Sequence, residues 1–232
     1  MREKSHKLTE DRTKLYAAEV LVAIESLHVR DIIYRDLKPE NVLIDEDGHC
    51  VLTDFGLSKE GVKEDQVNKS FCGSVAYLAP EVLKKQGHTQ SVDWYNFGTL
   101  IYEMIDSKPP FFADNRDKIY QNILKATLTF PAHVSVELKD LLTGLLQKDP
   151  RKRLCDSDAI RSHKWFSSIN WKDAEDRKLI VPRPSLPPIK SVPMSAPMEL
   201  EESDDPSAQN MVKWTYVRGE EENKDSKPTT HI

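Results

Sequence analysis

Apolar residues recur at helical spacing near the start of the chain. Within residues 16–28 they fall on one face, which is typical of a helix that packs against a core (Ala17, Val20, Leu21, Ile24 and Leu27). Similar one-sided patterns predict helices over residues 91–105, 115–126 and 137–147, separated by Pro, Gly or polar breaks. We therefore expect a mainly helical domain that continues to about residue 180.

Two short apolar runs interrupt this helical pattern, at residues 42–44 and 50–52. Asp47 and Gly48 lie between them, and this pair readily supplies the positive φ of a tight turn. The pattern predicts one small β-hairpin, so the expected fold class is mainly α with a small β-hairpin.

The composition changes near residue 182. Seven of the fourteen prolines lie between Pro182 and Pro206, and an acidic run occupies residues 199–205. Such a segment buries too little apolar surface to offset the entropy of ordering it, and the acidic run is typical of a solvated charge cluster. We predict a folded domain over residues 1–181 and a flexible tail over residues 182–232.

Length and charge narrow the class of protein. No apolar run approaches the roughly 18 residues of a membrane helix, and a net charge of −5 argues against a nucleic-acid surface. The charged N-terminus lacks the apolar core of a signal peptide, and Cys50, Cys72 and Cys155 are too scattered for a disulfide framework. We expect a reducing compartment, the cytoplasm or the nucleus.

Four polar residues around the hairpin match the needs of phosphoryl transfer. That reaction requires an acceptor for a hydroxyl proton, a cation near the transferred group and oxygen ligands for Mg²⁺. Asp36, Lys38, Asn41 and Asp54 provide these types. Because the hairpin folds the chain back on itself, Asp54 can lie at the same end of the hairpin as Asn41. Any one of these four residues alone would be a weak signal for this chemistry.

Three short segments occur in a fixed order, namely YRDLKPEN at Tyr34–Asn41, DFG at Asp54–Gly56 and APE at Ala79–Glu81. This order resembles the signature set of protein kinases. The segments Phe71–Glu81 and Met211–Tyr216 resemble the AGC group of serine/threonine protein kinases. The resemblance implies a protein-kinase large lobe over residues 1–181 and an AGC-type tail with a hydrophobic motif over residues 182–232.

The resemblance implies a role for each matched residue, with ATP and Mg²⁺ as cofactors. Asp36 would be the catalytic base, Lys38 would contact the transferring phosphate, and Asn41 and Asp54 would ligate Mg²⁺. The nucleotide would contact Lys38, Glu40, Asn41, Leu43 and Asp54, with Leu43 under the adenine. A metal-dependent hydrolase built on Asp36 and Asp54 is an alternative that the order of the flanking motifs disfavours.

Five further residues would be structural. The resemblance implies that Tyr34 and Phe55 stack in a hydrophobic spine that Asp93 holds from below. It also implies a buried ion pair between Glu81 and Arg153. Because burying such a pair carries a desolvation cost, we interpret it as fixing the substrate-binding loop more than as adding stability.

The segment between residues 56 and 79 holds the expected switch. Ser70 aligns with the phosphorylated residue of AGC activation loops, and Arg35 and Lys59 align with its phosphate ligands. A phosphoserine would gather both cations and order the loop, which implies an upstream activating kinase as a partner. In the tail, Thr215 is the candidate phosphosite of the hydrophobic motif, and Ser195 is a weaker turn-motif candidate.

Substrate recognition is expected at Glu40, Ser74 and Glu103. The two carboxylates would favour protein substrates with basic residues near the target hydroxyl. Val75 and Ala76 replace the usual Pro-Glu pair, so one acid that the family can use toward substrate arginines is missing.

The sequence contains no Gly-rich loop, no Val-Ala-x-Lys strand and no Glu-bearing helix to pair with that lysine. We expect a kinase whose small lobe is supplied in cis or in trans; the alternative is a non-catalytic binding module. The chain by itself should be inactive and should expose an apolar face around the upper ends of Tyr34, Leu43 and Phe55. We expect the chain to self-associate or to bind a partner at this face, because large apolar patches rarely stay bare.

Overall fold

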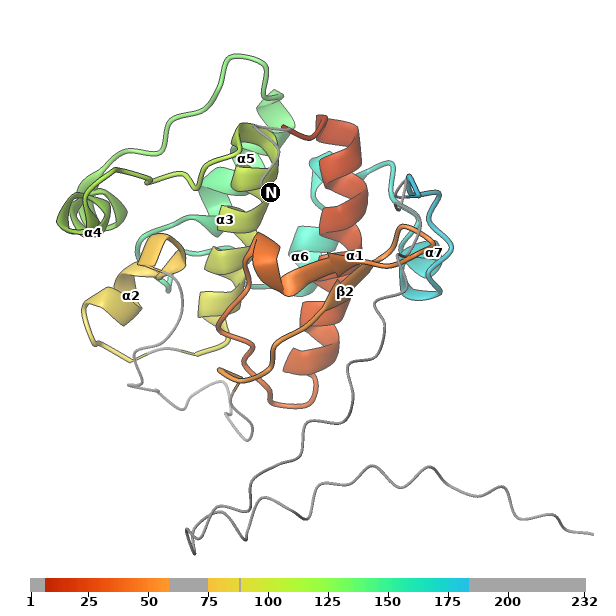
Figure 1. Cartoon of the computed structure of the whole chain (residues 1–232), viewed down its shortest axis with the longest axis horizontal. Coiled ribbons are helices and arrows are strands. Elements are labelled where there is room, and N and C mark those ends of the chain that lie inside the picture. Colours follow the sequence, from red (N-terminus) through yellow and green to blue (C-terminus); the bar gives the residue numbers. More distant parts are fainter. Residues whose placement is uncertain (1–6, 59–74, 88, 184–232) are drawn as a thin grey trace, which may run out of the picture. The chain divides into compact units, whose positions relative to one another are not determined.

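The computed structural model describes residues 7–58, 75–87 and 89–183. Its elements follow the chain in the order α1 (Glu10–His28), β1 (Val42–Ile44), β2 (Cys50–Leu52), α2 (Pro80–Leu83), α3 (Ser91–Asp106), α4 (Arg116–Lys125), α5 (Val136–Leu145), α6 (Ser157–Arg161) and α7 (Trp171–Glu175) (Figure 1). Short 3₁₀ turns occupy Pro39–Asn41, Val75–Tyr77 and Lys164–Phe166. The predicted class, mainly helical with one small hairpin, is confirmed. The boundary between domain and tail stays a prediction.

Helix α1 begins before the apolar pattern that predicted it. The hydroxyl of Thr9 accepts a hydrogen bond from the Arg12 amide at 3.4 Å, which caps the first turn, and the charges of Glu10 and Asp11 interact favourably with the positive end of the helix dipole. The central part of the helix is buried, with Leu21 and Ile24 fully inaccessible. At 19 residues, α1 is the longest helix that the structure describes, but no described helix is long and apolar enough to cross a membrane.

Helix α3 lies between α1 and α5 and is buried on nearly all sides. Gly98 permits its close approach to α5, because a Cβ at that position would lie 2.9 Å from the Cβ of Leu145. The helix ends at Ser107, whose left-handed backbone lets its amide donate to the carbonyl of Glu103 at 2.6 Å. The core therefore rests on three helices that are distant in sequence.

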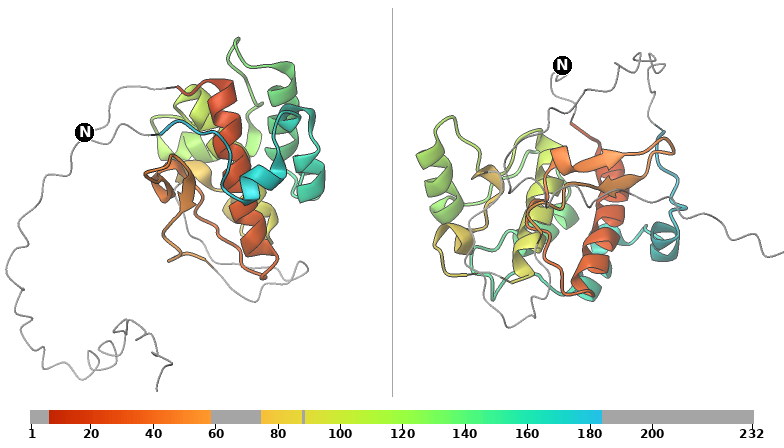
Figure 2. Two further views of the ribbon diagram at one scale, coloured as in Figure 1. Left: turned by 90° about the vertical axis from the view of Figure 1, so that its right-hand side faces the viewer. Right: turned by 60° about the horizontal axis from the view of Figure 1, so that its bottom comes forward.

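The hairpin lies against α1 (Figures 1 and 2). Its antiparallel register pairs Val42 with Leu52 and Ile44 with Cys50, which places Gly48, with φ of 97°, in the turn. The buried carboxylate of Glu19 on α1 accepts from the Cys50 amide at 2.7 Å and contacts His49 Nδ1 at 2.5 Å. These two bonds fix the hairpin to the core.

Residues 177–183, here called the strap, cross the hairpin turn. Arg177 forms an ion pair with Asp45, and Arg183 pairs with Asp47 at 3.0 Å. The carbonyl of Pro182 lies so close to Gly48 that a Cβ there would be 2.6 Å from its oxygen. Gly48 is therefore buried under the strap, whereas Glu46 and Asp47 at the tip of the turn are exposed.

Candidate active site

The loop of residues 34–41 connects α1 to the hairpin and is held by α3. Asp93, whose side chain is completely buried, accepts hydrogen bonds from the amides of Tyr34 at 2.9 Å and Arg35 at 2.7 Å. Arg35 has a φ of 69°, a left-handed conformation that costs a non-glycine residue about 1–3 kcal/mol. The Asp93 bonds offset this cost and define the backbone that presents Asp36.

Asp36, Lys38 and Asn41 form one hydrogen-bonded cluster. Asp36 Oδ2 lies 2.5 Å from Lys38 Nζ and 2.9 Å from Asn41 Nδ2. Asn41 Nδ2 also donates to the Asp36 carbonyl at 2.8 Å. Because the amide nitrogen is used within the cluster, the amide oxygen of Asn41 is its atom suited to a cation. The Asp36 carboxylate is 4% exposed and is oriented by both neighbours.

The hairpin returns the chain to this cluster. The Thr53 amide donates to the carbonyl of Asn41 at 2.9 Å, so Asp54 follows directly after a residue that is bonded to the cluster. Asp54 has a φ of 57°, and its exposed carboxylate accepts from the Gly56 amide at 3.3 Å. The predicted return of Asp54 toward Asn41 is thus present in the backbone.

Tyr34 connects the two halves of the site. Its hydroxyl donates to the Thr53 carbonyl, and its ring meets that of Phe55 edge-on with centroids 5.4 Å apart. Burial, followed by the negative charges of nearby carboxylates such as Asp36 and Asp54, raises the pKa of Tyr34 to about 12. Asp36 and Asp54 therefore both lie close enough to Tyr34 for their charges to affect its hydroxyl. The predicted ring contact of Tyr34 with Phe55 is present, and Asp93 holds the Tyr34 amide.

Asn41 and Asp54 fit a magnesium ion that takes its other ligands from phosphates and water. Mg²⁺ is usually bound through one or two carboxylates plus substrate phosphates, not in an all-protein cage. Among the residues that the structure describes, no group of three or more His, Cys, Asp or Glu could hold a metal ion. The Asp54 carboxylate and the Asn41 amide oxygen suit a Mg²⁺ site that substrate phosphates complete.

An exposed apolar face borders the site. Leu43 is 53% exposed and Phe55 is 49% exposed, and Ile44 and Val51 on the hairpin are also exposed. The expectation that Tyr34 contributes to this face is wrong: Tyr34 is 0% exposed because its hydroxyl bonds to the hairpin backbone and its ring packs under Phe55. Because the register pairs Leu43 with Val51, these two side chains share one side of the hairpin, and Ile44 points to the other side. We call Leu43, Val51 and Phe55 the apolar face.

The predicted ion pair between Glu81 and Arg153 is buried and bidentate. Arg153 Nη1 and Nη2 lie 2.6 and 2.8 Å from the two carboxylate oxygens. Arg153 also donates to the carbonyls of Gln147 and Ser91, and its guanidinium lies 5.0 Å from the ring centroid of Tyr95. The pair fixes the N-terminal end of α2 to the segment after α5.

Glu103 has a partner that the sequence did not indicate. The hydroxyl of Tyr77 donates to Glu103, and burial, then this hydrogen bond, raises the pKa of Tyr77 well above its usual range. The negative charge of Glu40 raises the same pKa, so Glu40 and Glu103 both lie near the Tyr77 hydroxyl. The only sequence signal for Tyr77 was its position two residues before Ala79.

Several predicted residues lie outside the described part of the chain. They are Lys59, Ser70, Cys72, Ser74, Ser195 and Thr215. The expected contacts of Arg35 and Lys59 with a phosphate at Ser70 therefore stay predictions. Within the described part, Arg35 Nε donates to the carbonyl of Leu57 at 2.6 Å.

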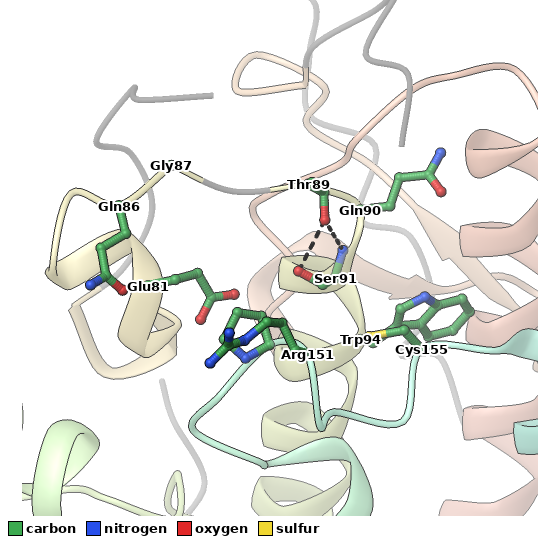
Figure 3. Close-up of a pocket in the computed structure, with 10 residues that line it drawn as sticks. Glu81, Gln86, Gly87, Thr89, Gln90, Ser91, Trp94, Arg151 and Cys155 are labelled. Carbon is green, nitrogen blue, oxygen red and sulfur yellow. Dashed lines mark hydrogen bonds between the residues drawn. The ribbon is translucent and has the colours of Figure 1, made fainter. Parts of the chain in front are cut away.

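A pocket of about 540 Å³ lies beside α2 and the start of α3, and none of Asp36, Lys38, Asn41 and Asp54 lines it (Figure 3). Thr89, Gln90, Trp94, Arg151 and Cys155 contribute to its wall. A smaller hollow of about 120 Å³ shares Gln90, Trp94 and Cys155 with it and also includes His28. Glu81 of the APE segment also lines the larger pocket, but the sequence analysis predicted no pocket here.

Comparison with known proteins agrees with the motifs. The protein kinase domain family matches residues 1–166. A RAC family serine/threonine-protein kinase homolog of Dictyostelium discoideum is 43% identical over 189 residues, covering 81% of this chain and 42% of the relative. Human RAC-beta serine/threonine-protein kinase is 44% identical, covering 75% and 37% respectively. Human serine/threonine-protein kinase Sgk2 is 46% identical, covering 78% and 50%.

The chain thus spans half or less of the length of these curated relatives. The matched residues include the loop with Asp36 and Asn41, the hairpin and the ion pair of Glu81 with Arg153. The chain therefore belongs to the protein kinase domain family and, within it, to the AGC serine/threonine kinases that its motifs resemble.

Proposed function

We propose that the whole protein transfers the γ-phosphoryl group of ATP to serine or threonine in protein substrates, and that this chain supplies the large-lobe half of that site. The observation that carries the proposal is the cluster of Asp36, Lys38 and Asn41, with Asp54 returned beside it by the hairpin. Phosphoryl transfer depends mainly on positioning and charge stabilisation, and these residues supply both.

Each residue of the cluster has a distinct task in this proposal. Asp36 accepts the proton of the substrate hydroxyl, and its hydrogen bonds to Lys38 and Asn41 fix the orientation of the carboxylate. The Lys38 ammonium supplies positive charge near the transferred group. Asn41 and Asp54 would hold Mg²⁺, which when bound neutralises charge on the phosphates. Leu43 offers an exposed apolar side chain beneath the adenine.

The proposal also includes a preference for protein substrates with basic residues near the target residue. Glu40 and Glu103 both act on Tyr77, so two carboxylates border one region of the surface. We propose that these acids, with Ser74, receive a substrate that carries arginine before the target residue. Profiling on a peptide array tests this, and a profile with no basic preference would remove it.

Regulation by phosphorylation at Ser70 completes the proposal. Arg35 and Lys59 are the proposed ligands of that phosphate, and an upstream kinase would place it; Thr215 is the second proposed phosphosite. If the Ser70→Ala variant kept the wild-type activity, the proposal that phosphorylation at Ser70 activates the protein would be refuted. We further propose that the protein acts in the cytoplasm or the nucleus.

The central test is a phosphotransfer assay on a form that carries a complete nucleotide cleft, with the small lobe in cis or added in trans. Asp36→Asn should lower kcat by about 10²-fold or more, because positioned general bases contribute roughly 10²–10⁴-fold. Asp31→Asn is the matched control, since Asp31 is an exposed aspartate that also has positive φ. Equal activity of the two variants would exclude Asp36 as the base.

A second candidate function is a non-catalytic binding module, which the exposed apolar face favours. Such a module would bind partners at that face without turning over ATP. It would be insensitive to Asp36→Asn and sensitive to a charge at Leu43. The assay above therefore separates the two functions.

A further inference from the structure

Lys148 lies in the segment that follows α5, and its ammonium reaches α4. Nζ donates to the carbonyl of Ile123 at 2.6 Å and to that of Asn122 at 3.3 Å. It also lies 4.1 Å from the ring centroid of Phe111, a buried residue that precedes α4. The ammonium therefore contacts both the end of α4 and the segment that leads into this helix.

These contacts supply a donor that the end of α4 lacks. The last four carbonyls of a helix have no amide of a next turn to bond to. At Ala126 the backbone becomes extended, with φ of −68° and ψ of 144°, and the Ala126 amide bonds to the carbonyl of Asn122 at 2.9 Å. Ile123 is 0% exposed, so bulk water does not reach its carbonyl. The positive charge of Lys148 also interacts favourably with the negative end of the helix dipole.

Helix α4 is attached to the domain by little apolar surface. Of its 10 residues, only Ile123 is buried. The helix lies beside α2 at an edge of the domain (Figures 1 and 2). A second polar contact joins Asn122 Nδ2 to the carbonyl of Phe111 at 3.4 Å. With so little apolar burial, the position of α4 depends on these polar contacts, and the charged one is the stronger of the two.

The position of α4 matters for the proposed substrate surface. The helix packs against the 3₁₀ turn Val75–Tyr77 and against α2. Val75 directly follows Ser74, and the hydroxyl of Tyr77 donates to Glu103. Ser74 and Glu103 are both proposed substrate-binding residues. A shift of α4 would therefore disturb the turn that connects Ser74 with the contact of Tyr77 and Glu103.

Lys148 occupies a position that disfavours its charge. Burial, followed by the positive charge of Lys84, lowers the pKa of Lys148 to about 8. An apolar side chain of similar length would avoid this cost, since replacing buried charged groups by apolar ones is often neutral or stabilising. Stability alone therefore does not account for a lysine here, whereas its contacts with α4 do.

We propose that Lys148 is a positioning residue for substrate binding: it holds the C-terminal end of α4, and α4 holds the turn Val75–Tyr77. The attachment of α4 stands on the contacts alone. Its consequence for substrates rests on the proposed function.

Amide hydrogen exchange on the 232-residue chain tests the attachment of α4. Lys148→Met keeps the length of the side chain and removes its donors and charge, whereas Lys148→Arg keeps both. We expect the Ala126 amide, which bonds to Asn122, to exchange about tenfold faster in Lys148→Met and at the wild-type rate in Lys148→Arg. The Leu21 amide in α1 is the reference and should keep its rate. Lys152→Met, at an exposed lysine of the same segment, is the matched control and should change neither amide.

A general stabilising role for Lys148 predicts a different pattern. The Ala126 and Leu21 amides would then exchange faster by the same factor in Lys148→Met, because the whole domain would open more often. That result, or equal Ala126 rates in Lys148→Met and Lys152→Met, would overturn the proposal. If Lys148→Met does not fold, Lys148→Gln replaces it, because its amide is one atom shorter and carries no charge.

Kinetics on the form with a complete nucleotide cleft test the consequence for substrates. Lys148→Met should raise KM for a peptide substrate about fivefold with kcat and KM for ATP unchanged, because it disturbs a substrate surface and leaves the Asp36 cluster intact. Lys148→Arg should restore the peptide KM. An unchanged peptide KM in Lys148→Met would refute the role in substrate binding. A wild-type form without transferase activity would refute the proposed function, and with it the consequence for substrates, and would leave the exchange result valid.

Discussion

The ion pair of Glu81 and Arg153 offers a quantitative test of how tightly the domain is closed. The side chains are 2% and 0% exposed, so neither charge is solvated by water. We consider Glu81→Gln, which keeps the shape of the side chain and removes its charge. One of the two Arg153 nitrogens that bond to Glu81 would then face an amide NH2 group, which donates hydrogen bonds and cannot accept them.

The expected loss follows from the desolvation of the remaining charge. Removing one partner of a buried pair typically costs about 3–5 kcal/mol. Arg153 would keep its bonds to the carbonyls of Gln147 at 3.1 Å and Ser91 at 2.9 Å, and its contact with the Tyr95 ring. We therefore expect the lower end of the range, about 3 kcal/mol in the free energy of unfolding.

Urea denaturation of the 232-residue chain measures this loss. Lys172→Ala is the control, because Lys172 and Asp176 form an exposed pair at 2.9 Å that should contribute less than about 1 kcal/mol. The double variant Glu81→Leu with Arg153→Met should be more stable than Glu81→Gln alone, since it leaves no unpaired buried charge. A loss for Glu81→Gln as small as that of the control would refute the reasoning.

Three further outcomes are expected. The isolated chain should show no phosphotransfer, because positioning supplies roughly 7–11 kcal/mol of barrier reduction in well-oriented systems; calorimetry with Mg-ATP and an assay with and without an added small lobe check this, and robust transfer that Asp54→Asn abolishes would contradict it. Leu43→Lys should reduce self-association in sedimentation experiments, whereas Val136→Lys, at an isolated apolar position that is 76% exposed, should not; equal effects would exclude the apolar face as the contact surface. Although burial raises the pKa of Glu10, its bonds to Ser135 and Trp165 lower it overall, so its contribution to stability is present above the unfolded pKa and is lost as the pH falls through the folded pKa. The acid side of a stability profile should therefore be flatter in Glu10→Gln, and an unchanged profile would count against these bonds.

Local chemistry explains why the hairpin and the site cluster were predictable. Asp47 and Gly48 specify the turn, and the register of β1 with β2 follows from it. Asp36 and Asn41 are close in sequence, so their contact needs only one loop. The start of α1 was missed because the six residues before Tyr16 carry no apolar face; the Thr9 cap and tertiary contacts make them helical.

Contacts between distant segments could not be predicted without the fold. The bond of Tyr77 to Glu103 and that of His28 to Asp93 depend on where α3 packs. The burial of Tyr34 was also missed, because a side chain's exposure depends on what covers it. Short helices such as α2 and α7, with four and five residues, show too few turns for a periodic pattern.

The strap over the hairpin turn has a practical consequence for protein engineering. Any replacement of Gly48 would meet both an unfavourable φ of 97° and the carbonyl of Pro182. Conversely, a shortened expression form that stops at Glu175 would remove Arg177 and Arg183 and expose the turn. A useful minimal version of the domain should therefore extend through Arg183, and fusion partners or affinity tags belong after that residue.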